Sequence, residues 1–237
     1  MKLRTIFLVG LYALIVLAVI PVLFICMILG AREPLLRIGK WAMGISRAVL
    51  GLRVDVSGLA HADPPGASVF MANHVSFLDG PLLFWLIPRP PLVILKKGVF
   101  RIPVVGLGMK YVGFVPVDRK GQSGGRASVE MAARTMKERG WSFLIFPEGT
   151  RSRDGRFQAL RRGGFFLAQT AGAPIIPVSI RGTFEIMPKG RPYPKKGSIR
   201  VMFHPPVPVA GRAPETMAEL MEEVRSRIAS GLAEERL

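Results

Sequence analysis

The sequence predicts an α/β fold with a central, mostly parallel mixed β-sheet flanked by helices, preceded by an N-terminal membrane-anchoring helical segment. Two observations lead to this prediction. From residue 52 onward, short apolar runs alternate with helix-like stretches, a pattern typical of a largely parallel sheet. Before it, residues 6–29 form an apolar run without a charged side chain. We therefore divide the chain into an N-terminal part, residues 1–51, and a globular domain, residues 52–237.

The apolar run at residues 6–29 is long enough for a membrane anchor. As a helix rising ~1.5 Å per residue, it covers the ~30 Å hydrocarbon core of a bilayer. A cleaved signal peptide would have a shorter apolar region, and Leu29-Gly30-Ala31 is a poor cleavage site. Basic residues flank the run on both sides, so charge asymmetry decides neither its orientation nor whether it crosses the bilayer.

Residues 33–51 predict a second, amphipathic helix. At about 100° per residue, the basic side chains of Arg37, Lys40 and Arg47 share one narrow arc, and apolar side chains occupy most of the remainder. Such a helix suits the membrane interface, where basic side chains reach head-group phosphates and apolar ones enter the acyl layer. The alternative is an ordinary amphipathic helix packed on the globular domain. We take the interfacial position as the expectation.

The globular domain alternates strands and helices. Strands are expected at residues 52–56, 67–71, 92–95, 112–117, 142–146, 175–180 and 198–203. Helices are expected at residues 80–86, 104–111, 126–138, 160–170 and 214–232. Residues 121–125 and 188–197, which are rich in Gly, Pro and Lys, are expected to be loops. Side chains that follow parallel strands meet at the carboxyl edge of the sheet, where α/β folds hold their ligands.

Charge and hydropathy indicate the class of partner. The net charge is +17, the isoelectric point about 11.2 and the mean hydropathy +0.34. Nucleic-acid-binding proteins are basic but polar, whereas an anionic membrane surface attracts a chain that is both basic and apolar. The single cysteine, Cys26, excludes an internal disulfide, and three scattered histidines argue against a zinc centre. We expect neither a metal nor a nucleic-acid partner, and we expect His61 and His204 to be solvent-exposed or structural.

His74 and Asp79 form the first candidate site, directly behind the expected strand 67–71. A neutral imidazole, with a reference pKa of ~6.5, is suited to removing a proton near neutral pH while a carboxylate holds its other ring N–H. Five positions on a regular helix are about 140° apart, so the pair can meet only across a bend. Asp79-Gly80-Pro81 is typical of a helix start, which places that bend between strand and helix. The alternative is structural: a histidine ends the strand and an aspartate caps the helix.

Two further blocks follow expected strands. Residues 96–119 read KKGVFRIPVVGLGMKYVGFVPVDR, and residues 146–152 read FPEGTRS. Together with NHVSFLD at residues 73–79 and APIIPVSI at residues 173–180, they resemble, in order and spacing, the glycerolipid acyltransferase family, in particular its bacterial 1-acyl-sn-glycerol-3-phosphate (lysophosphatidic acid) acyltransferases. The resemblance covers residues 54–208 and makes the predicted fold glycerolipid acyltransferase-like.

The resemblance implies catalysis by His74 with Asp79, in which the histidine takes the proton of the acceptor hydroxyl as that hydroxyl attacks a thioester. It also implies an acceptor that carries a phosphate, for which Lys96 supplies a point charge and Arg151 a bidentate contact. Gly149 would let the backbone come close to the ligand. The implied substrate-binding residues are Lys96, Arg119, Glu148, Gly149, Thr150 and Arg151.

Several roles stay open in the sequence. Glu148 either binds a glycerol hydroxyl or holds Arg151, and Arg119 serves either phosphate binding or structure. Ser76 offers a competing acyl-enzyme route, but no Gly-x-Ser-x-Gly elbow surrounds it, so direct transfer is favoured. Gly98 departs from the family pattern, in which an acidic residue commonly follows the lysines. The other basic residues of these blocks are expected at the surface or facing lipid: Lys97, Arg153, Arg161 and Arg162.

The resemblance implies transfer of a fatty acyl group from acyl-CoA or acyl carrier protein to 1-acylglycerol-3-phosphate, giving phosphatidic acid without a cofactor. The partners would be lysophosphatidic acid, anionic phospholipids and the acyl donor. Residues 52–237 would form the acyltransferase catalytic domain, facing the cytoplasm at the cytoplasmic membrane. Two other interpretations stay open: a related O-acyltransferase acting on glycerol-3-phosphate or a lyso-aminolipid, and a basic membrane-bound interaction protein without turnover.

Overall fold

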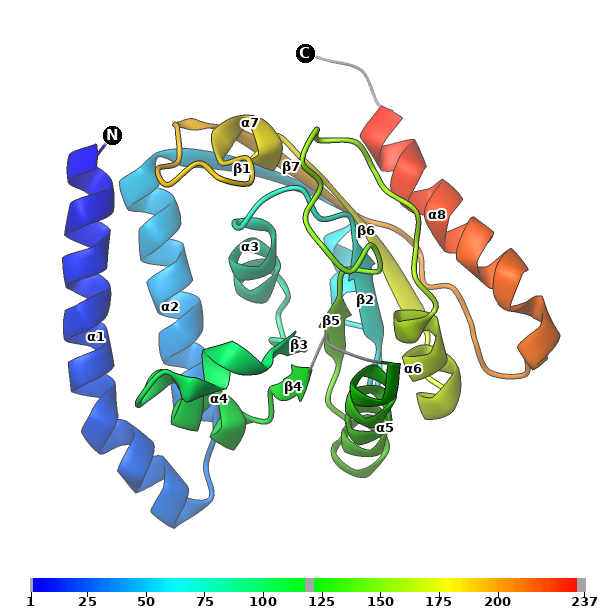
Figure 1. Cartoon of the computed structure of the whole chain (residues 1–237), viewed down its shortest axis with the longest axis horizontal. Helices are drawn as coiled ribbons and strands as arrows, with labels where there is room; N and C mark the ends of the chain where they lie inside the picture. Colours follow the sequence, from blue (N-terminus) through cyan, green and yellow to red (C-terminus); the bar gives the residue numbers. More distant parts are fainter. Residues whose placement is uncertain (1, 118–121, 234–237) are drawn as a thin grey trace.

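The computed structural model describes residues 2–117 and 122–233, in which one mixed sheet lies between two helical layers (Figure 1). The strand order is β1-β7-β6-β2-β5-β3-β4. Within these residues every neighbouring pair is parallel except β6 and β7. The strands are β1 (Leu52–Ser57), β2 (Val69–Ala72), β3 (Leu92–Lys96), β4 (Val115–Val117), β5 (Phe143–Ile145), β6 (Ile175–Arg181) and β7 (Gly197–Phe203). The prediction of an α/β fold with a mostly parallel mixed sheet is confirmed.

The helices divide between the two faces of the sheet (Figure 1). One face carries α1 (Lys2–Leu29), α2 (Glu33–Leu50) and α3 (Asp79–Leu86). The other face carries α5 (Gln122–Arg139), α6 (Gly163–Ala171) and α8 (Met217–Ala233). Shorter helices lie in connections: α4 (Val105–Val112), α7 (Thr183–Ile186) and the 3₁₀ turns η1 (Leu59–Ala62), η2 (Lys97–Arg101) and η3 (Pro214–Thr216).

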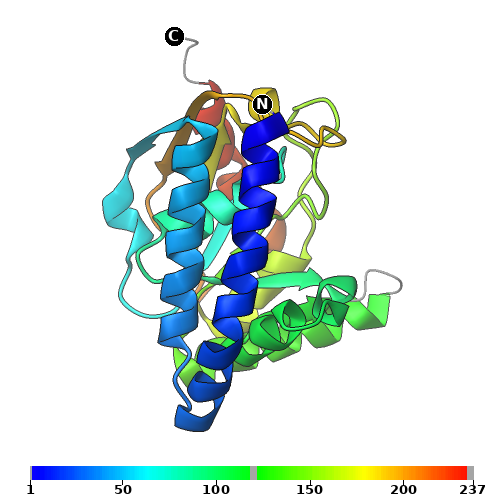
Figure 2. The same cartoon turned by 90° about the vertical axis from the view of Figure 1, so that its left-hand side faces the viewer.

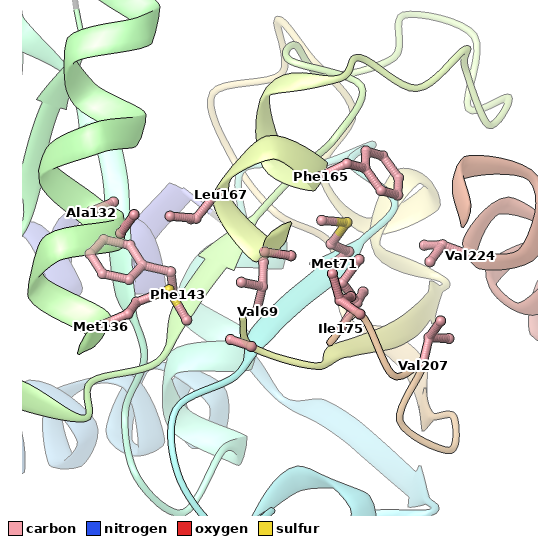
Figure 3. Packing of buried hydrophobic residues seen from close by; sticks show 14 of the residues in the cluster. Val69, Met71, Ala132, Met136, Phe143, Phe165, Leu167, Ile175, Val207 and Val224 are labelled. Carbon is pink, nitrogen blue, oxygen red and sulfur yellow. The ribbon is translucent and has the colours of Figure 1, made fainter. Parts of the chain in front are cut away.

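The central strand β2 is buried on both faces, as expected for a strand inside a parallel sheet. Val69 and Met71 enter the core beneath α5, α6 and α8, whereas Phe70 and Ala72 enter the core beneath α1, α2 and α3. Figure 3 shows the first core, in which β2 meets Phe143 and the following side chains: Ala132, Met136, Phe165, Leu167, Ile175, Val207 and Val224. Because burial fixes β2 so firmly, it also fixes the residues that directly follow it.

Some element boundaries differ from those expected. The strand expected at residues 112–117 begins only at Val115, because Val112 still belongs to α4 and Gly113 ends that helix at φ +102°. The loop expected at residues 121–125 is wrong for residues 122–125, which form the first turn of α5. The main-chain N–H groups of a first turn have no intrahelical partner, so glycines are tolerated there more easily than in a helix interior.

The helices α1 and α2 run side by side in opposite directions along one side of the domain (Figure 2). The Tyr12 hydroxyl lies 2.8 Å from Ser46 Oγ between them. At the turn that joins the two helices, the Arg32 guanidinium lies 3.1 Å from the centre of the Trp141 ring and donates a hydrogen bond to the carbonyl of Val112. The hairpin is therefore attached to the domain at its turn as well as along its length.

The helix α1 presents most of its apolar side chains outward. Residues Leu3–Leu29 are long and apolar enough to cross a membrane, judged by length and composition. The helix packs against α2 on one side only. Its most exposed large apolar side chains are Leu3, Ile6, Phe7, Val9, Leu14, Leu17, Phe24, Ile25, Ile28 and Leu29. A lipid environment would cover this surface at no cost in desolvated polar groups.

The basic side chains of α2 were expected to face lipid head groups. This expectation is wrong for Lys40 and Arg47. Lys40 Nζ donates to the carbonyl of Ile87 at 2.8 Å, and Arg47 Nη1 donates to the carbonyl of Leu52 at 3.3 Å. The Arg47 guanidinium also lies 5.1 Å from the centre of the Trp85 ring. These two cations bind the protein itself and do not extend toward head groups.

Two glycines explain why this arc meets the domain. A Cβ at Gly39 would lie 3.3 Å from the Phe84 ring, and a Cβ at Gly44 would lie 3.2 Å from the Trp85 ring. The missing side chains let α2 pack closely against α3. Gly44 lies on the basic arc itself, so this close packing brings the arc against the domain. Arg37, on the same arc, is exposed.

Candidate active site

His74 and Asp79 meet at the carboxyl end of β2, across the turn that leads into α3. His74 follows β2 by one residue, and Asp79 is the first residue of α3. His74 Nδ1 lies 2.9 Å from Asp79 Oδ2. The Asp79 side chain is fully buried, whereas 19% of the His74 side chain is exposed. The geometry is that of a carboxylate holding one ring nitrogen while the outer part of the imidazole reaches the surface.

Main-chain N–H groups of the turn also bind the Asp79 carboxylate. The N–H groups of Val75 and Ser76 both donate to Asp79 Oδ2 at 2.8 Å. An ionised carboxylate only accepts hydrogen bonds, so Nδ1 of His74 carries the proton that it shares with Asp79. This arrangement leaves Nε2 of His74 as the basic nitrogen. Within residues 2–117 and 122–233, Nε2 makes no hydrogen bond, and it is available to a substrate.

The FPEGTRS block packs directly on His74. Phe146, which follows β5, stacks on the imidazole with ring centres 4.0 Å apart and an angle of 17° between the planes. Glu148 Oε1 accepts the main-chain N–H of His74 at 2.6 Å, and the N–H of Ser152 donates to the carbonyl of His74 at 2.8 Å. The block therefore holds both the ring and the main chain of His74.

The buried carboxyl of Glu148 binds the main chain of the protein. The sequence offered two other roles for it, binding a glycerol hydroxyl or holding Arg151. Its second oxygen, Oε2, accepts the N–H of Gln158 at 2.9 Å, so the side chain joins the His74 turn to the loop before α6. In the described part of the chain it forms no ion pair with Arg151. Burial raises the pKa of Glu148, and the main-chain hydrogen bonds from Gln158 and His74 oppose that rise.

The structure places the expected phosphate-binding residues on neighbouring strands. Lys96 ends β3, Arg151 follows β5, and both strands run parallel to β2, with β5 between β2 and β3. Lys96 is exposed and Arg151 is half-buried, and neither side chain has a hydrogen bond or ion pair to another described residue. Both cations therefore stand at the same edge of the sheet as His74 and are free to bind an anion.

Three further residues were expected to bind the substrate: Gly149, Thr150 and Arg119. The carbonyl of Thr150 accepts Nε2 of Gln158 at 3.2 Å. Gly149 adopts φ +75°, and a Cβ there would lie 2.9 Å from the side chain of Arg161, so its turn conformation and this neighbour explain the glycine. The expected approach of a ligand to Gly149 is not needed to explain it. Arg119 lies outside the described residues.

The Ser76 hydroxyl is engaged inside the protein. Ser76 is fully buried, and its Oγ donates to the carbonyl of Met187 at 2.8 Å while accepting the N–H of Leu78 at 3.2 Å. A nucleophile would have to leave both contacts and reach the surface. The Ser76 hydroxyl is therefore poorly placed to act as a nucleophile.

Two further residues take part in the site: Asn73, which the sequence places in the NHVSFLD block without a role, and Thr183, which was not among the expected site residues. Asn73 Nδ2 donates to the carbonyl of Ile180 at 2.9 Å, and Asn73 Oδ1 accepts the N–H of Ile180 at 2.8 Å, so the side chain continues the β2–β6 pairing. Thr183, the second residue after β6, donates to Asp79 Oδ1 at 2.7 Å. The rule that polar residues after parallel strands meet at one edge would have selected both. His204, expected to be solvent-exposed or structural, is buried with its Nε2 2.7 Å from Ser179 Oγ.

Comparison with known proteins finds similar acyltransferases. The family model described as Acyltransferase matches residues 53–181. A chloroplastic 1-acyl-sn-glycerol-3-phosphate acyltransferase of Brassica napus is 35% identical over 187 residues, which are 76% of this chain and 51% of that protein. The human 1-acyl-sn-glycerol-3-phosphate acyltransferase alpha is 27% identical over 201 residues, 85% of this chain and 71% of that protein. The chain spans about half the length of the first relatives that it matches.

A solved structure matches nearly the whole chain. The crystal structure of the 1-acyl-sn-glycerophosphate (LPA) acyltransferase PlsC from Thermotoga maritima superposes with a TM-score of 0.85 at 26% sequence identity. The match covers 98% of this chain and 95% of that one, so it includes the N-terminal hairpin and the sheet together.

Proposed function

Because the chain belongs to the acyltransferase family, we propose that it transfers a fatty acyl group from an acyl thioester to the free hydroxyl of 1-acylglycerol-3-phosphate, giving phosphatidic acid. The observation that carries the proposal is the buried Asp79 carboxylate bound to Nδ1 of His74, with Nε2 left free beside the edge of the sheet. The names of the similar proteins support this choice of acceptor.

In the proposed reaction, His74 acts as general base. Nε2 takes the proton of the acceptor hydroxyl while its oxygen attacks the thioester carbonyl, and a tetrahedral intermediate forms. The intermediate collapses with loss of the thiolate, which takes the proton back from the imidazolium. Asp79 keeps Nδ1 protonated and stabilises the imidazolium electrostatically without accepting its proton. The products are the ester and the free thiol, and the enzyme returns to its starting state without a cofactor.

Lys96 and Arg151 are proposed to bind the acceptor phosphate. Among the described residues neither cation has a partner; both lie at the edge that carries His74, after two neighbouring strands. A guanidinium offers two parallel donors to a phosphate, and an ammonium offers a compact charge. Two cations arriving from different directions would orient the glycerol backbone with its free hydroxyl toward Nε2 of His74.

The protein is proposed to act at the cytoplasmic face of the membrane. The exposed apolar surface of α1 supports membrane association, and the net charge of +17 supports attraction to anionic phospholipids. A lyso-lipid acceptor resides in the bilayer, while acyl-CoA and acyl carrier protein are water-soluble donors of the cytoplasm. Contact between the two substrates therefore requires a site at the interface.

The experiment that tests this function is an acceptor panel with purified full-length protein in detergent, monitored by thiol release. The panel contains lysophosphatidic acid, glycerol-3-phosphate and a lyso-aminolipid, each with acyl-CoA and with acyl carrier protein as donor. We expect turnover with lysophosphatidic acid to exceed the others by at least about ten-fold in kcat/KM. Preference for another acceptor would make the protein a related O-acyltransferase, and no turnover with any acceptor would make it a non-catalytic protein.

A further inference from the structure

Thr183 occupies an unusual place next to the catalytic pair. It is the first residue of α7, two positions beyond the end of β6, and its side chain is fully buried. Its hydroxyl donates to Asp79 Oδ1 at 2.7 Å, across 104 positions of sequence. The bond joins a segment outside the HVSFLD turn to the carboxylate that holds His74.

The two oxygens of Asp79 are held in different ways. Oδ2 receives three donors, from the imidazole of His74 and from the N–H groups of Val75 and Ser76. In the described part of the chain, Oδ1 receives only the hydroxyl of Thr183. Rotation of the carboxylate about its Cβ–Cγ bond is therefore opposed at Oδ1 by a single side chain, and loss of that side chain's hydroxyl would leave a buried oxygen unpaired.

The chain is built so that Thr183 reaches this position. Gly182 adopts φ +87°, and a Cβ there would lie 2.2 Å from the carbonyl oxygen of Ser198, so glycine makes the turn out of β6. At the other end of α7, the carbonyl of Met187 accepts the Ser76 hydroxyl at 2.8 Å. The α7 segment is therefore bound to the His74–Asp79 turn at two points, one on each side.

We propose that Thr183 is a positioning residue for the acyl transfer: its hydroxyl fixes the Asp79 carboxylate so that His74 keeps Nε2 directed at the acceptor. This inference rests on the proposed function. The methyl group of threonine restricts rotation about its Cα–Cβ bond, so the hydroxyl is held in a direction that serine would hold less firmly. Among the described residues, His74 is the titratable side chain in contact with Asp79, and Glu148 contacts the main chain of His74.

The test is steady-state kinetics across pH for full-length wild type, Thr183→Val and Thr183→Ser, with thiol release as readout. Thr183→Val keeps the side-chain shape but removes the hydroxyl, and we expect kcat to fall about ten- to a hundred-fold with both KM values little changed. The acidic limb of the kcat/KM profile should move to lower pH, because a misplaced carboxylate favours the imidazolium less. Thr183→Ser should restore most of kcat.

Two further variants keep the result interpretable. Thr183→Ala removes the hydroxyl without placing a methyl group against the carboxylate, and it replaces Thr183→Val where that variant does not fold. In an Asp79→Asn background, the same substitution at Thr183 should cost little more, because a residue that acts through Asp79 loses its effect when the carboxylate is gone. Full additivity would assign Thr183 to packing alone and overturn the inference.

The experiments distinguish failure of this inference from failure of the proposed function. A Thr183→Val enzyme with wild-type kcat and pH profile, beside an inactive His74→Ala enzyme, overturns the role of Thr183 and leaves the function intact. A His74→Ala enzyme with wild-type turnover overturns the proposed mechanism, whatever Thr183 does.

Discussion

Oε1 of Glu148 lies 2.6 Å from the main-chain nitrogen of His74, although 74 positions separate the two residues in the chain. The contact crosses from the turn after β5 to the turn after β2, two neighbouring parallel strands. Glu148 fixes the position of the His74 main chain, and Asp79 fixes the orientation of the imidazole ring.

Stability as a function of pH tests the state of Glu148. Because the pKa of Glu148 is raised, the folded protein binds a proton at this carboxyl more tightly than the unfolded chain, whose value is near 4.5. Its contribution to stability is therefore fully present below pH 4.5 and is lost as the pH rises through the folded pKa. We expect the Tm advantage of wild type over Glu148→Gln to shrink as the pH rises from 4.5.

Glu223 on α8 provides the control with the opposite sign. Hydrogen bonding by Arg212 at 2.6 Å, helped by the nearby charge of Arg227, lowers the pKa of Glu223. Its contribution is present above the unfolded pKa and is lost as the pH falls through the folded pKa. The Tm advantage of wild type over Glu223→Gln should therefore fall as the pH drops below 4.5 and stay level above that value. The same trend in both variants would contradict the environment assigned to Glu148.

Removal of the His74 imidazole should abolish most turnover. We expect His74→Ala to lose about 10²–10⁴-fold in kcat, the scale of losing a general base, while the protein stays folded and membrane-bound. Ser76→Ala is the matched control in the same turn. It loses the hydrogen bond to Met187, at a cost of about 1 kcal/mol of stability, but keeps most of kcat. An inactive, folded Ser76→Ala enzyme would restore the acyl-enzyme route.

Loss of the Arg151 side chain should raise the KM for the acceptor but not the KM for the acyl donor. Arg151→Ala removes a charge-assisted contact of about 1.5–3 kcal/mol, so the KM for lysophosphatidic acid should rise roughly ten- to a hundred-fold. The KM for the acyl donor should change little. Arg153→Ala, which removes an exposed arginine of the same loop, is the control and should leave both values unchanged. Equal effects of Arg151→Ala on both substrates would assign Arg151 to structure or donor binding.

The basic arc of α2 should divide into structural and membrane-binding cations. Lys40→Glu breaks the bonds of Nζ to two main-chain carbonyls and places an anion beside them, so Tm should fall. Arg37→Glu changes an exposed side chain, so Tm should stay, while binding to anionic vesicles should weaken by about 1 kcal/mol per unit of charge. Vesicle sedimentation and thermal unfolding of both variants measure the difference. Equal Tm values would contradict the packing of α2.

The parts of the site that the sequence predicted are local. His74 and Asp79 are five positions apart, and the helix-start signal in Asp79-Gly80-Pro81 is sufficient to place the bend between them. Thr183 and Glu148 follow expected strands and could be selected as candidates, but their contacts with Asp79 and His74 could not be predicted, because these depend on which strands are neighbours in the sheet. The order β6-β2-β5 brings both beside His74, and nothing in the individual segments encodes that order.

The incorrect expectation that Lys40 and Arg47 face lipid head groups has a different physical origin. Helical periodicity identifies which side chains share an arc, but it does not say what that arc faces. Lys40 and Arg47 carry long apolar stems that pack within the protein while their charged ends find carbonyl oxygens. The nearby glycines Gly39 and Gly44 were the signal for close packing against another element.

The attachment of Arg32 to Trp141 has a mechanical consequence. The turn of the α1–α2 hairpin is held on the domain, Lys40 joins α2 to the end of α3, and α3 begins at Asp79. The hairpin and the catalytic edge are therefore joined by a continuous series of contacts. In a bilayer, a tilt that hydrophobic mismatch imposes on α1 would be passed on to the height of His74 above the lipid. Under the proposed function, membrane thickness would then change how far the lyso-lipid acceptor must rise to meet the imidazole.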